Sequence, residues 1–152
     1  MKPLRPFTDF LKEGIVKKQS PNKQRAESLV NRAKDEYYSL RENVSKSGIH
    51  EKNANSIIKD AYDIIMELIR AKMMVDGFNA SGSYSHEAEV SYLRELKFLE
   101  PEVQFINQLR YFRNGISYYG EKQTPEYAKR VVDFLEKIYL KLLRLLQLER
   151  LR

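Results

Sequence analysis

The sequence predicts an all-α protein, folded as an up-and-down bundle of four to five helices. Only six glycines and five prolines occur among the 152 residues, and they separate long segments whose apolar residues recur every three or four positions. No segment alternates apolar and polar residues over enough length to suggest a sheet. Because the connections between the long helices are short, neighbouring helices should run antiparallel. We expect one domain, with the bundle in residues 20–152 and an arm or short helix in residues 1–19.

The first two helices differ in how strongly the sequence supports them. Residues 8–18 suit a short, weak helix with Thr8 as its candidate N-cap, although a loose arm fits the same residues. The second helix has a better start, because Ser20 can cap free backbone amides and the proline after it fits the first helical position. Its pattern continues to about Lys46, and Gly48 ends it.

The clearest amphipathic helix follows, from about Asn53 to Val75. Its core positions hold apolar residues: Ile57, Ile58, Ala61, Ile64, Ile65 and Leu68. The opposite side carries charged residues at the spacing of a solvent-exposed face: Asp60, Asp63, Glu67 and Arg70. This helix should therefore place one face in the core and the other in water.

A loop and a short helix come next. The segment from Asp76 to Ser85 contains two glycines and small polar residues, which predicts a loop. The following residues, 86–99, have the length and pattern of a short helix, which Ser83 or Ser85 should cap.

The last two helices each begin at a proline. Pro101 begins a helix that runs to about Tyr119, and Thr124 with the proline after it begins a helix that continues nearly to the C-terminus. The core face of the last helix holds Val131, Val132, Leu135, Ile138, Leu142 and Leu145 or Leu146. Apolar residues outside that face are Phe134, Leu140, Leu143 and Leu148. A second apolar surface on a small helical protein favours a subunit contact, so we expect a homodimer.

Basic residues also share one face of the last helix: Arg130, Lys137, Lys141 and Arg144. A solvated face and a track for the phosphates of RNA or a nucleotide are both compatible with this stripe. The net charge of +6 at pH 7 favours anionic partners, nucleic acid above all.

Composition excludes several functions. The chain has no cysteine, which excludes a disulfide framework and a thiolate nucleophile. It has only two histidines, too few for a histidine-based metal site, and we expect no metal and no cofactor. Glycine-rich phosphate loops, serine nucleophile elbows and the carboxylate–histidine pairs of di-iron bundles do not occur. No stretch approaches about 20 uncharged apolar residues and no signal-peptide core is present, so we expect a cytoplasmic protein that does not enter a membrane.

The helix that begins at Pro101 holds the residues best suited to chemistry. Its apolar side is formed by Phe105, Ile106, Leu109, Phe112 and Ile116, with Tyr119 expected in the core near the same side. Its polar stripe holds Asn107, Arg110, Asn114 and Ser117. Arg113 lies at the seam between the two, so its guanidinium should be partly desolvated and needs a partner. That partner is either a carboxylate of the preceding long helix, namely Asp60, Asp63 or Glu67, or the phosphate of a ligand.

The order and spacing of these motifs give a family resemblance. A long amphipathic helix is followed by GFNASGSYSHEAEVSYL, then by LRYFRNGISYYG, then by a long terminal helix. This arrangement, from about Ser20 to Leu148, resembles the HEPN family of small helical domains. The resemblance implies paired protomers that share a cleft, built from an Arg, often a polar residue beside it, and a His about five positions later. In many members the cleft is a metal-independent ribonuclease site. Others bind RNA or nucleotides, or act beside a small nucleotidyltransferase in a toxin–antitoxin pair.

Mapped onto this sequence, the Arg of that motif is Arg113, its polar neighbour is Asn114, and the His position holds Tyr118. The resemblance makes these three the candidate catalytic residues. An unperturbed Tyr, with a pKa of about 10, is a poor base at pH 7, but it can donate a hydrogen bond or stack on a base. Ligand binding should therefore survive this substitution better than catalysis.

Three hypotheses follow. The first is an HEPN-like protein of a toxin–antitoxin or defence system that binds RNA or a nucleotide, with catalytic activity weakened or lost. Its binding residues are Arg110, Arg113, Asn114, Ser117, Tyr118, Lys137 and Lys141. The second is a metal-independent endoribonuclease toxin in which Tyr118 or His86 replaces the missing His. The third is a subunit that partners a minimal nucleotidyltransferase. Outside these roles, His86 should make a capping or inter-helix hydrogen bond, and Asp60 should be solvated or paired with an Arg.

Overall fold

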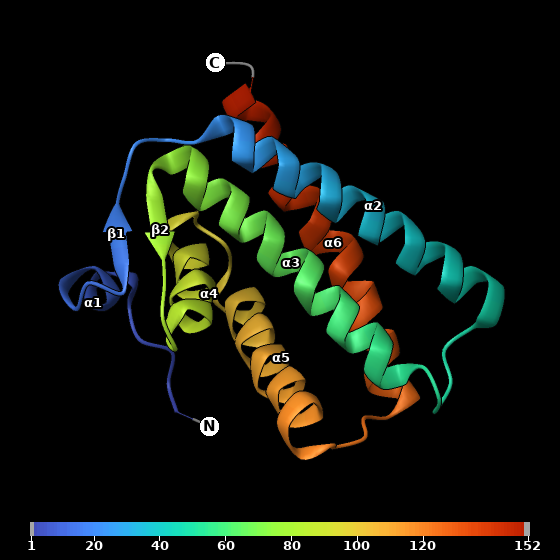
Figure 1. Cartoon of the computed structure of the whole chain (residues 1–152). Coiled ribbons are helices and arrows are strands. Elements are labelled where there is room, and N and C mark those ends of the chain that lie inside the picture. The colour runs from blue at the N-terminus through green and yellow to red at the C-terminus, as the bar shows by residue number, and fades with distance from the viewer. Residues whose placement is uncertain (1, 151–152) are drawn as a thin grey trace.

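The computed structural model describes residues 2–150, except for the side chains of residues 117, 118 and 148–150. Within that part the chain forms six helices and one small two-stranded sheet, which confirms the all-α prediction (Figure 1). In chain order the elements are α1 (Phe7–Lys12), β1 (Val16–Lys18), α2 (Lys23–Ser47), α3 (Ala54–Asp76), β2 (Phe78–Ala80), α4 (Ser85–Glu95), α5 (Glu100–Tyr119) and α6 (Pro125–Arg150).

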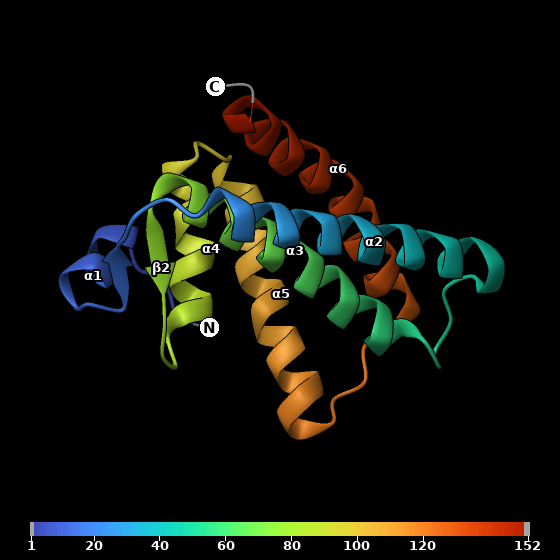
Figure 2. The ribbon, with the colours of Figure 1, turned by 45° about the horizontal axis from the view of Figure 1, so that its top comes forward.

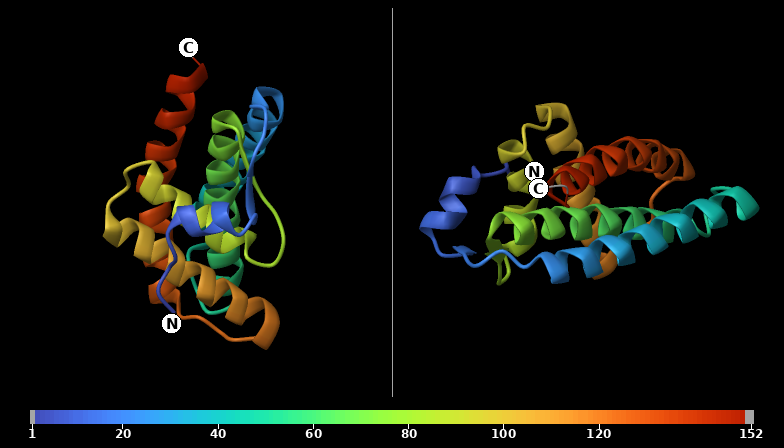
Figure 3. Two further views of the ribbon diagram at one scale, coloured as in Figure 1. Left: turned by 90° about the vertical axis from the view of Figure 1, so that its left-hand side faces the viewer. Right: turned by 90° about the horizontal axis from the view of Figure 1, so that it is seen from above.

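The core is organised around α3. This helix packs against α2 and α6, and α4 and α5 also contact it. Seen from above, α2, α3 and α6 lie side by side with α3 in the middle (Figure 3, right panel). All six predicted core positions of α3 are buried: Ile57, Ile58, Ala61, Ile64, Ile65 and Leu68. The prediction of a solvent-exposed opposite side is wrong for Glu67, which is 7% exposed and pairs with Arg32 of α2 (Oε1 to Nε 3.3 Å).

The N-terminal residues differ from the predicted helix over 8–18. The helix α1 ends at Lys12, and the residues of β1 pair antiparallel with β2 instead of continuing it. Pro6 occupies the N-cap position of α1, so Thr8 lies inside the helix and does not cap it. A strand of three residues is too short to display a period of two, which is why the pattern did not indicate it.

Aromatic side chains hold α1 against the bundle. Phe7 and Phe10 are buried. The centroid of the Phe7 ring lies 5.4 Å from that of Phe78 in β2 and 4.8 Å from that of Tyr92 in α4. The helix therefore lies at one end of the molecule, beside β2 and α4 (Figure 2). This places the N-terminal segment next to the beginning of α4.

The helix α2 begins at Lys23, two residues later than predicted with Ser20 as the N-cap. Its N-cap is Asn22, whose side-chain oxygen accepts a backbone N–H of the first turn (3.0 Å). The Asn22 backbone N–H donates to the carbonyl of Met74 (3.1 Å), so the chain before α2 is bonded to the end of α3 rather than wound into a helix. Gly48 ends α2 as predicted, with a φ of 70°.

The segment predicted as a loop between α3 and α4 contains β2. Tyr84 occupies the N-cap position of α4 without a side-chain hydrogen bond to the helix, so neither Ser83 nor Ser85 caps it. The helix also ends at Glu95, earlier than the predicted residue 99.

The predicted starts of α5 and α6 are confirmed. Pro101 lies in the first turn of α5, and the hydroxyl of Thr124 accepts the backbone N–H of Tyr127 (3.1 Å) at the start of α6. The expectation that Tyr119 lies in the core is wrong, because this residue is 80% exposed. It is the last residue of α5, and Gly120 after it has a left-handed conformation (φ 65°).

The second apolar surface of α6 is partly covered within the monomer. The predicted core residues of α6 are buried, except that Leu145 is half-buried. The ring of Phe134 stacks on Phe105 of α5 (centroids 4.2 Å apart), and Leu143 is half-buried. Leu140 is 54% exposed, while the side chain of Leu148 lies outside the described part. Less apolar surface is therefore left for a subunit contact than the sequence indicates.

No helix among the described residues combines the length and the apolar composition that crossing a membrane requires.

Candidate functional site

A pocket of about 300 Å³ lies where the beginning of α4 faces the C-terminal half of α5. The turn before α4 and its first residues supply Gly82, Ser83, Tyr84, Ser85, His86 and Glu87, and α5 supplies Arg110, Arg113 and Asn114. Four of these residues were chosen from the sequence: His86, Arg110, Arg113 and Asn114. The fold therefore brings together two motifs that are far apart in the chain.

The three α5 residues point to one site because of their spacing. Steps of three and four residues place Arg110, Arg113 and Asn114 on neighbouring positions of one helical surface. Next to them on the helix, one turn away, Ile106 and Leu109 are fully buried and seat α5 against the core. The polar residues are thus fixed on a packed helix and not on a mobile loop.

Arg110 is oriented by a neutral partner. Its Nε and Nη2 both donate to Oδ1 of Asn107, at 3.3 and 3.1 Å. Asn107 is 1% exposed, so this member of the polar stripe is a buried support for Arg110 and not a surface residue. Because the acceptor carries no charge, and no carboxylate of the described residues forms an ion pair with Arg110, its positive charge remains available to the pocket.

Arg113 is only loosely satisfied. Its Nη2 lies 3.7 Å from Oδ1 of Asp63, which is an ion-pair distance but too long for a good hydrogen bond. Its Nε is buried and has no hydrogen-bond partner among the described residues, and its guanidinium carbon lies 5.9 Å from the centroid of the Tyr62 ring. Of the three carboxylates proposed as partners, Asp63 is the one in contact, while Asp60 and Glu67 do not pair with it among the described residues. The side chain is 25% exposed, so a ligand can reach it.

His86 is the titratable member of the site. Its Nδ1 forms a hydrogen bond with the hydroxyl of Tyr62 (3.2 Å), as expected of an inter-helix contact. Burial lowers the pKa of His86, and the positive charges of Arg70, Arg113 and Arg110 lower it further, against the opposing effect of Glu89. Burial also raises the pKa of Tyr62, so its hydroxyl keeps its proton. His86 is therefore neutral at pH 7 and accessible from the pocket.

The acidic residues near the pocket are already paired. Glu89 is 2% exposed and accepts two hydrogen bonds from Arg70, at 2.7 and 3.1 Å. Glu87 at the rim pairs with Arg5 of the N-terminal segment (3.4 Å). These carboxylates therefore neutralise other arginines, and the pocket keeps the charge of Arg110 and Arg113.

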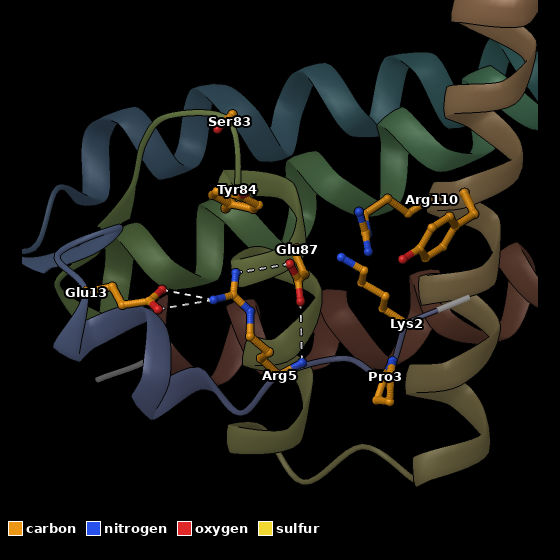
Figure 4. Close-up of a pocket in the computed structure, with 9 residues that line it drawn as sticks. Lys2, Pro3, Arg5, Glu13, Ser83, Tyr84, Glu87 and Arg110 are labelled. Atoms are coloured by element: carbon orange, nitrogen blue, oxygen red, sulfur yellow. Dashed lines mark hydrogen bonds and ion pairs between the residues drawn. The ribbon is translucent and has the colours of Figure 1, made fainter.

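The pocket adjoins a larger one of about 700 Å³ (Figure 4). This second pocket is lined by Lys2, Pro3, Arg5, Glu13, Ser83, Tyr84, Glu87, Arg110 and Tyr111. Sequence reasoning missed Lys2, Tyr84 and Tyr111 as site residues. The position of Tyr111 beside Arg110 was visible in the sequence, but no local pattern shows that the N-terminal segment lies against α4 and α5.

Five predicted site residues are not placed in this pocket. Lys137 and Lys141 lie on the exposed side of α6, and the ammonium of Lys141 pairs with Glu102 (2.5 Å) in the first turn of α5. Glu102 is eight residues before Arg110, about 12 Å along the helix, so Lys141 lies outside this pocket, and the binding role of the two lysines stays a prediction. Asp60 lines a separate groove between α2 and α3. The side chains of residues 117 and 118, predicted as Ser117 and Tyr118 of the site, lie outside the described part.

No cluster of three or more histidine or carboxylate ligands suited to a metal ion occurs among the residues that the structure describes. Comparison with models of known protein families, with curated proteins and with solved structures gives no significant match. The function must therefore be argued from the chemistry of the pocket.

Proposed function

We propose that this chain is an HEPN-like protein that binds RNA or a nucleotide by holding a phosphate group in the pocket between α4 and α5. One observation carries the proposal: Arg110 and Arg113 converge on the first turn of α4, where Arg110 pairs with no described carboxylate and Arg113 has a long contact of 3.7 Å with Asp63. Two guanidinium groups in a small pocket repel each other, so an anion that contacts both lowers the electrostatic energy.

A phosphate suits this pocket better than a carboxylate does. Arginine donates two parallel hydrogen bonds to phosphate oxygens, and the partly exposed guanidinium of Arg113 has a contact of 3.7 Å with Asp63 that is too long for a good hydrogen bond. The first turn of α4 adds backbone N–H groups and the positive end of a helix dipole, since no side chain caps that end. Asn114 can donate from its amide to a further oxygen. The donors therefore surround the anion from both helices.

The test compares Arg113→Gln with Arg41→Gln in an anisotropy assay with a fluorescent single-stranded RNA. Arg41 is a matched control, because it is an exposed arginine on α2 with one loose carboxylate contact (3.5 Å to Glu136). Losing a charged hydrogen-bond donor should weaken RNA binding about tenfold or more and reduce the salt slope by about 1. Arg41→Gln should change affinity less than about twofold. Equal effects of the two substitutions would contradict the proposal.

A second candidate function, metal-independent RNA cleavage, is favoured by the position of His86. Neutral His86 lies in the same pocket as Arg113, and Tyr62 fixes its ring. In this reaction the histidine takes the proton of a ribose 2′-hydroxyl, and the 2′-oxygen attacks the phosphorus while Arg113 stabilises the added negative charge. The P–O5′ bond breaks, leaving a cyclic phosphate and a 5′-oxygen that takes a proton from water. His86 would thus take the place of the missing His of the family motif, for which the sequence left both Tyr118 and His86 as candidates.

Incubation of the pure protein with total RNA in EDTA tests the second candidate. Cleavage that His86→Gln and Arg113→Gln abolish, and that Tyr118→Phe preserves, supports it. Intact RNA, or cleavage that survives both pocket substitutions, removes the ribonuclease and leaves the binding function.

A further inference from the structure

The larger pocket continues the phosphate pocket toward the N-terminal segment. The two share four lining residues: Ser83, Tyr84, Glu87 and Arg110. Arg110 therefore stands at the junction and faces both spaces. A ligand whose phosphate occupies the smaller pocket can extend past Arg110 into the larger one.

Two exposed tyrosines border the larger pocket. Tyr84 is 56% exposed and Tyr111 is 36% exposed, so both side chains leave apolar surface open to solvent at the pocket. A guanidinium lies near each ring: that of Arg5 is 5.2 Å from the centroid of Tyr84, and that of Arg110 is 4.7 Å from the centroid of Tyr111. These contacts hold the rings in place while leaving much of their surface open, which is the condition for stacking on a planar ligand.

The charge of the larger pocket is positive despite two carboxylates at its edge. Both carboxylates bind Arg5: Glu13 at 3.0 Å and Glu87 at 3.4 Å (Figure 4). The side chains of Lys2 and Arg110 point toward one another across the pocket, and no described carboxylate pairs with either (Figure 4). Like charges that converge in this way indicate an anion between them.

We infer that the ligand is a single-stranded polynucleotide that spans both pockets. One phosphate lies between Arg110 and Arg113, the adjoining base stacks against Tyr84 or Tyr111, and the next phosphate lies between Arg110 and Lys2. This inference rests on the proposed function and extends it. Aromatic rings beside a basic groove bind unpaired bases with little sequence preference, whereas the bases of a duplex are stacked on one another and cannot enter. A mononucleotide leaves one of the two anion positions empty.

The test uses 3′-fluorescein hexanucleotides of RNA and of DNA, each as a single strand and as a duplex, with the parent protein and three variants. Tyr84→Leu removes a ring at the pocket, and Tyr38→Leu is the matched control, because Tyr38 is an exposed tyrosine (67%) on α2. Lys2→Gln removes the second cation at a position that cannot disturb the core. Thermal unfolding of each variant confirms that it is folded.

Loss of base stacking should weaken single-strand binding at least about fivefold in Tyr84→Leu, against less than about twofold in Tyr38→Leu. Lys2→Gln should lower the salt slope by about 1. The parent should bind at least one single strand, RNA or DNA, more tightly than its duplex, and the tighter strand identifies the ligand.

The inference is overturned if the duplexes bind as tightly as both single strands. It is also overturned if Tyr84→Leu and Tyr38→Leu change the affinity for a single strand equally and Lys2→Gln leaves the salt slope unchanged. If Arg113→Gln weakens binding while these variants do not, the phosphate pocket stands and only the extension fails. If Arg113→Gln has no effect, the proposed function itself fails.

Discussion

At the scale of single residues, the most informative groups are buried polar atoms that lack a hydrogen-bond partner among the described residues. Within that part of the chain, the buried Nε of Arg113 has no acceptor and the buried Oε2 of Glu67 has no donor. Buried polar atoms of this kind are costly and therefore uncommon. For Arg113 this cost is one reason to propose an anionic ligand. For Glu67 it appears as a shifted pKa.

Glu67 should make the stability depend on pH. Burial, reinforced by the charge of Glu36, raises the pKa of Glu67 to about 6 from its ordinary value of 4.5. The folded state therefore favours the protonated form, so the stability that this group contributes is present below pH 4.5 and is lost as the pH rises through about 6. Glutamine imitates the protonated form at every pH.

We expect Glu67→Gln to gain unfolding free energy over the parent between pH 4.5 and pH 7.5, by roughly 1 to 2 kcal/mol. Urea titrations at the two pH values measure it. Asp35→Asn is the control, because Asp35 is an exposed carboxylate of the same groove. A difference between Glu67→Gln and the parent that does not change with pH would show that Glu67 is not protonated on folding.

The residues of the site were only partly predictable. Arg113 could be chosen because it lies at the seam of an amphipathic helix, where a desolvated charge needs a partner. The roles of Asn107, Tyr84 and Lys2 depend on which elements lie side by side, and periodicity within one helix carries no such information.

At the scale of elements, apolar periodicity identified the five longer helices, and the differences arise where contacts between elements decide the outcome. The helix α2 starts later than predicted because the chain before it is hydrogen-bonded to the end of α3, and β1 forms because β2 lies beside it. Gly77 is the link between α3 and β2, with a φ of 87°. A Cβ at this position would lie 2.8 Å from the carbonyl oxygen of Gln19, a contact that real side chains do not make.

Gly77→Ala should therefore destabilise the protein more than Gly120→Ala. Both glycines are left-handed residues at helix C-termini, with φ of 87° and 65°, but a Cβ on Gly120 would meet no atom within 4 Å. We expect Gly120→Ala to lose about 1 to 2 kcal/mol of unfolding free energy from backbone strain alone, and Gly77→Ala to lose about 1 to 3 kcal/mol more from the steric contact. Chemical denaturation of the two variants gives the comparison. Equal losses of unfolding free energy would show that the segment from β1 to α2 moves away from the added methyl group without a loss of stability.

At the scale of the whole molecule, charge is divided between two sides of α3. The groove between α2 and α3 is lined by five carboxylates: Asp35, Glu36, Asp60, Asp63 and Glu67. The pockets between α4, α5 and the N-terminal segment carry Lys2 and Arg110, which pair with no described carboxylate, and the loosely paired Arg113. A polyanion is therefore attracted to one side of the molecule and repelled from the other, which orients its approach.

The homodimer stays a prediction, and the fold narrows where it can form. Because α5 covers Phe134, the exposed apolar residue on the middle of α6 is Leu140. We propose that two copies meet through this part of α6, and light scattering at micromolar concentration should report twice the mass of 18.0 kDa. Leu140→Glu should return the monomer mass, whereas a parent protein that is already monomeric would exclude this interface.

The central claim, that Arg110 and Arg113 bind the phosphates of a nucleic acid, is tested most directly by the NMR signals of the arginine Nε–H groups during titration with a single-stranded RNA hexamer. We expect the signals of Arg110 and Arg113 to shift together and saturate, because both guanidinium groups line the pocket that binds the phosphate, while those of Arg41 and Arg144 stay in place. Signals of Arg110 and Arg113 that do not move while the RNA binds, or that move only as much as those of Arg41 and Arg144, would contradict it.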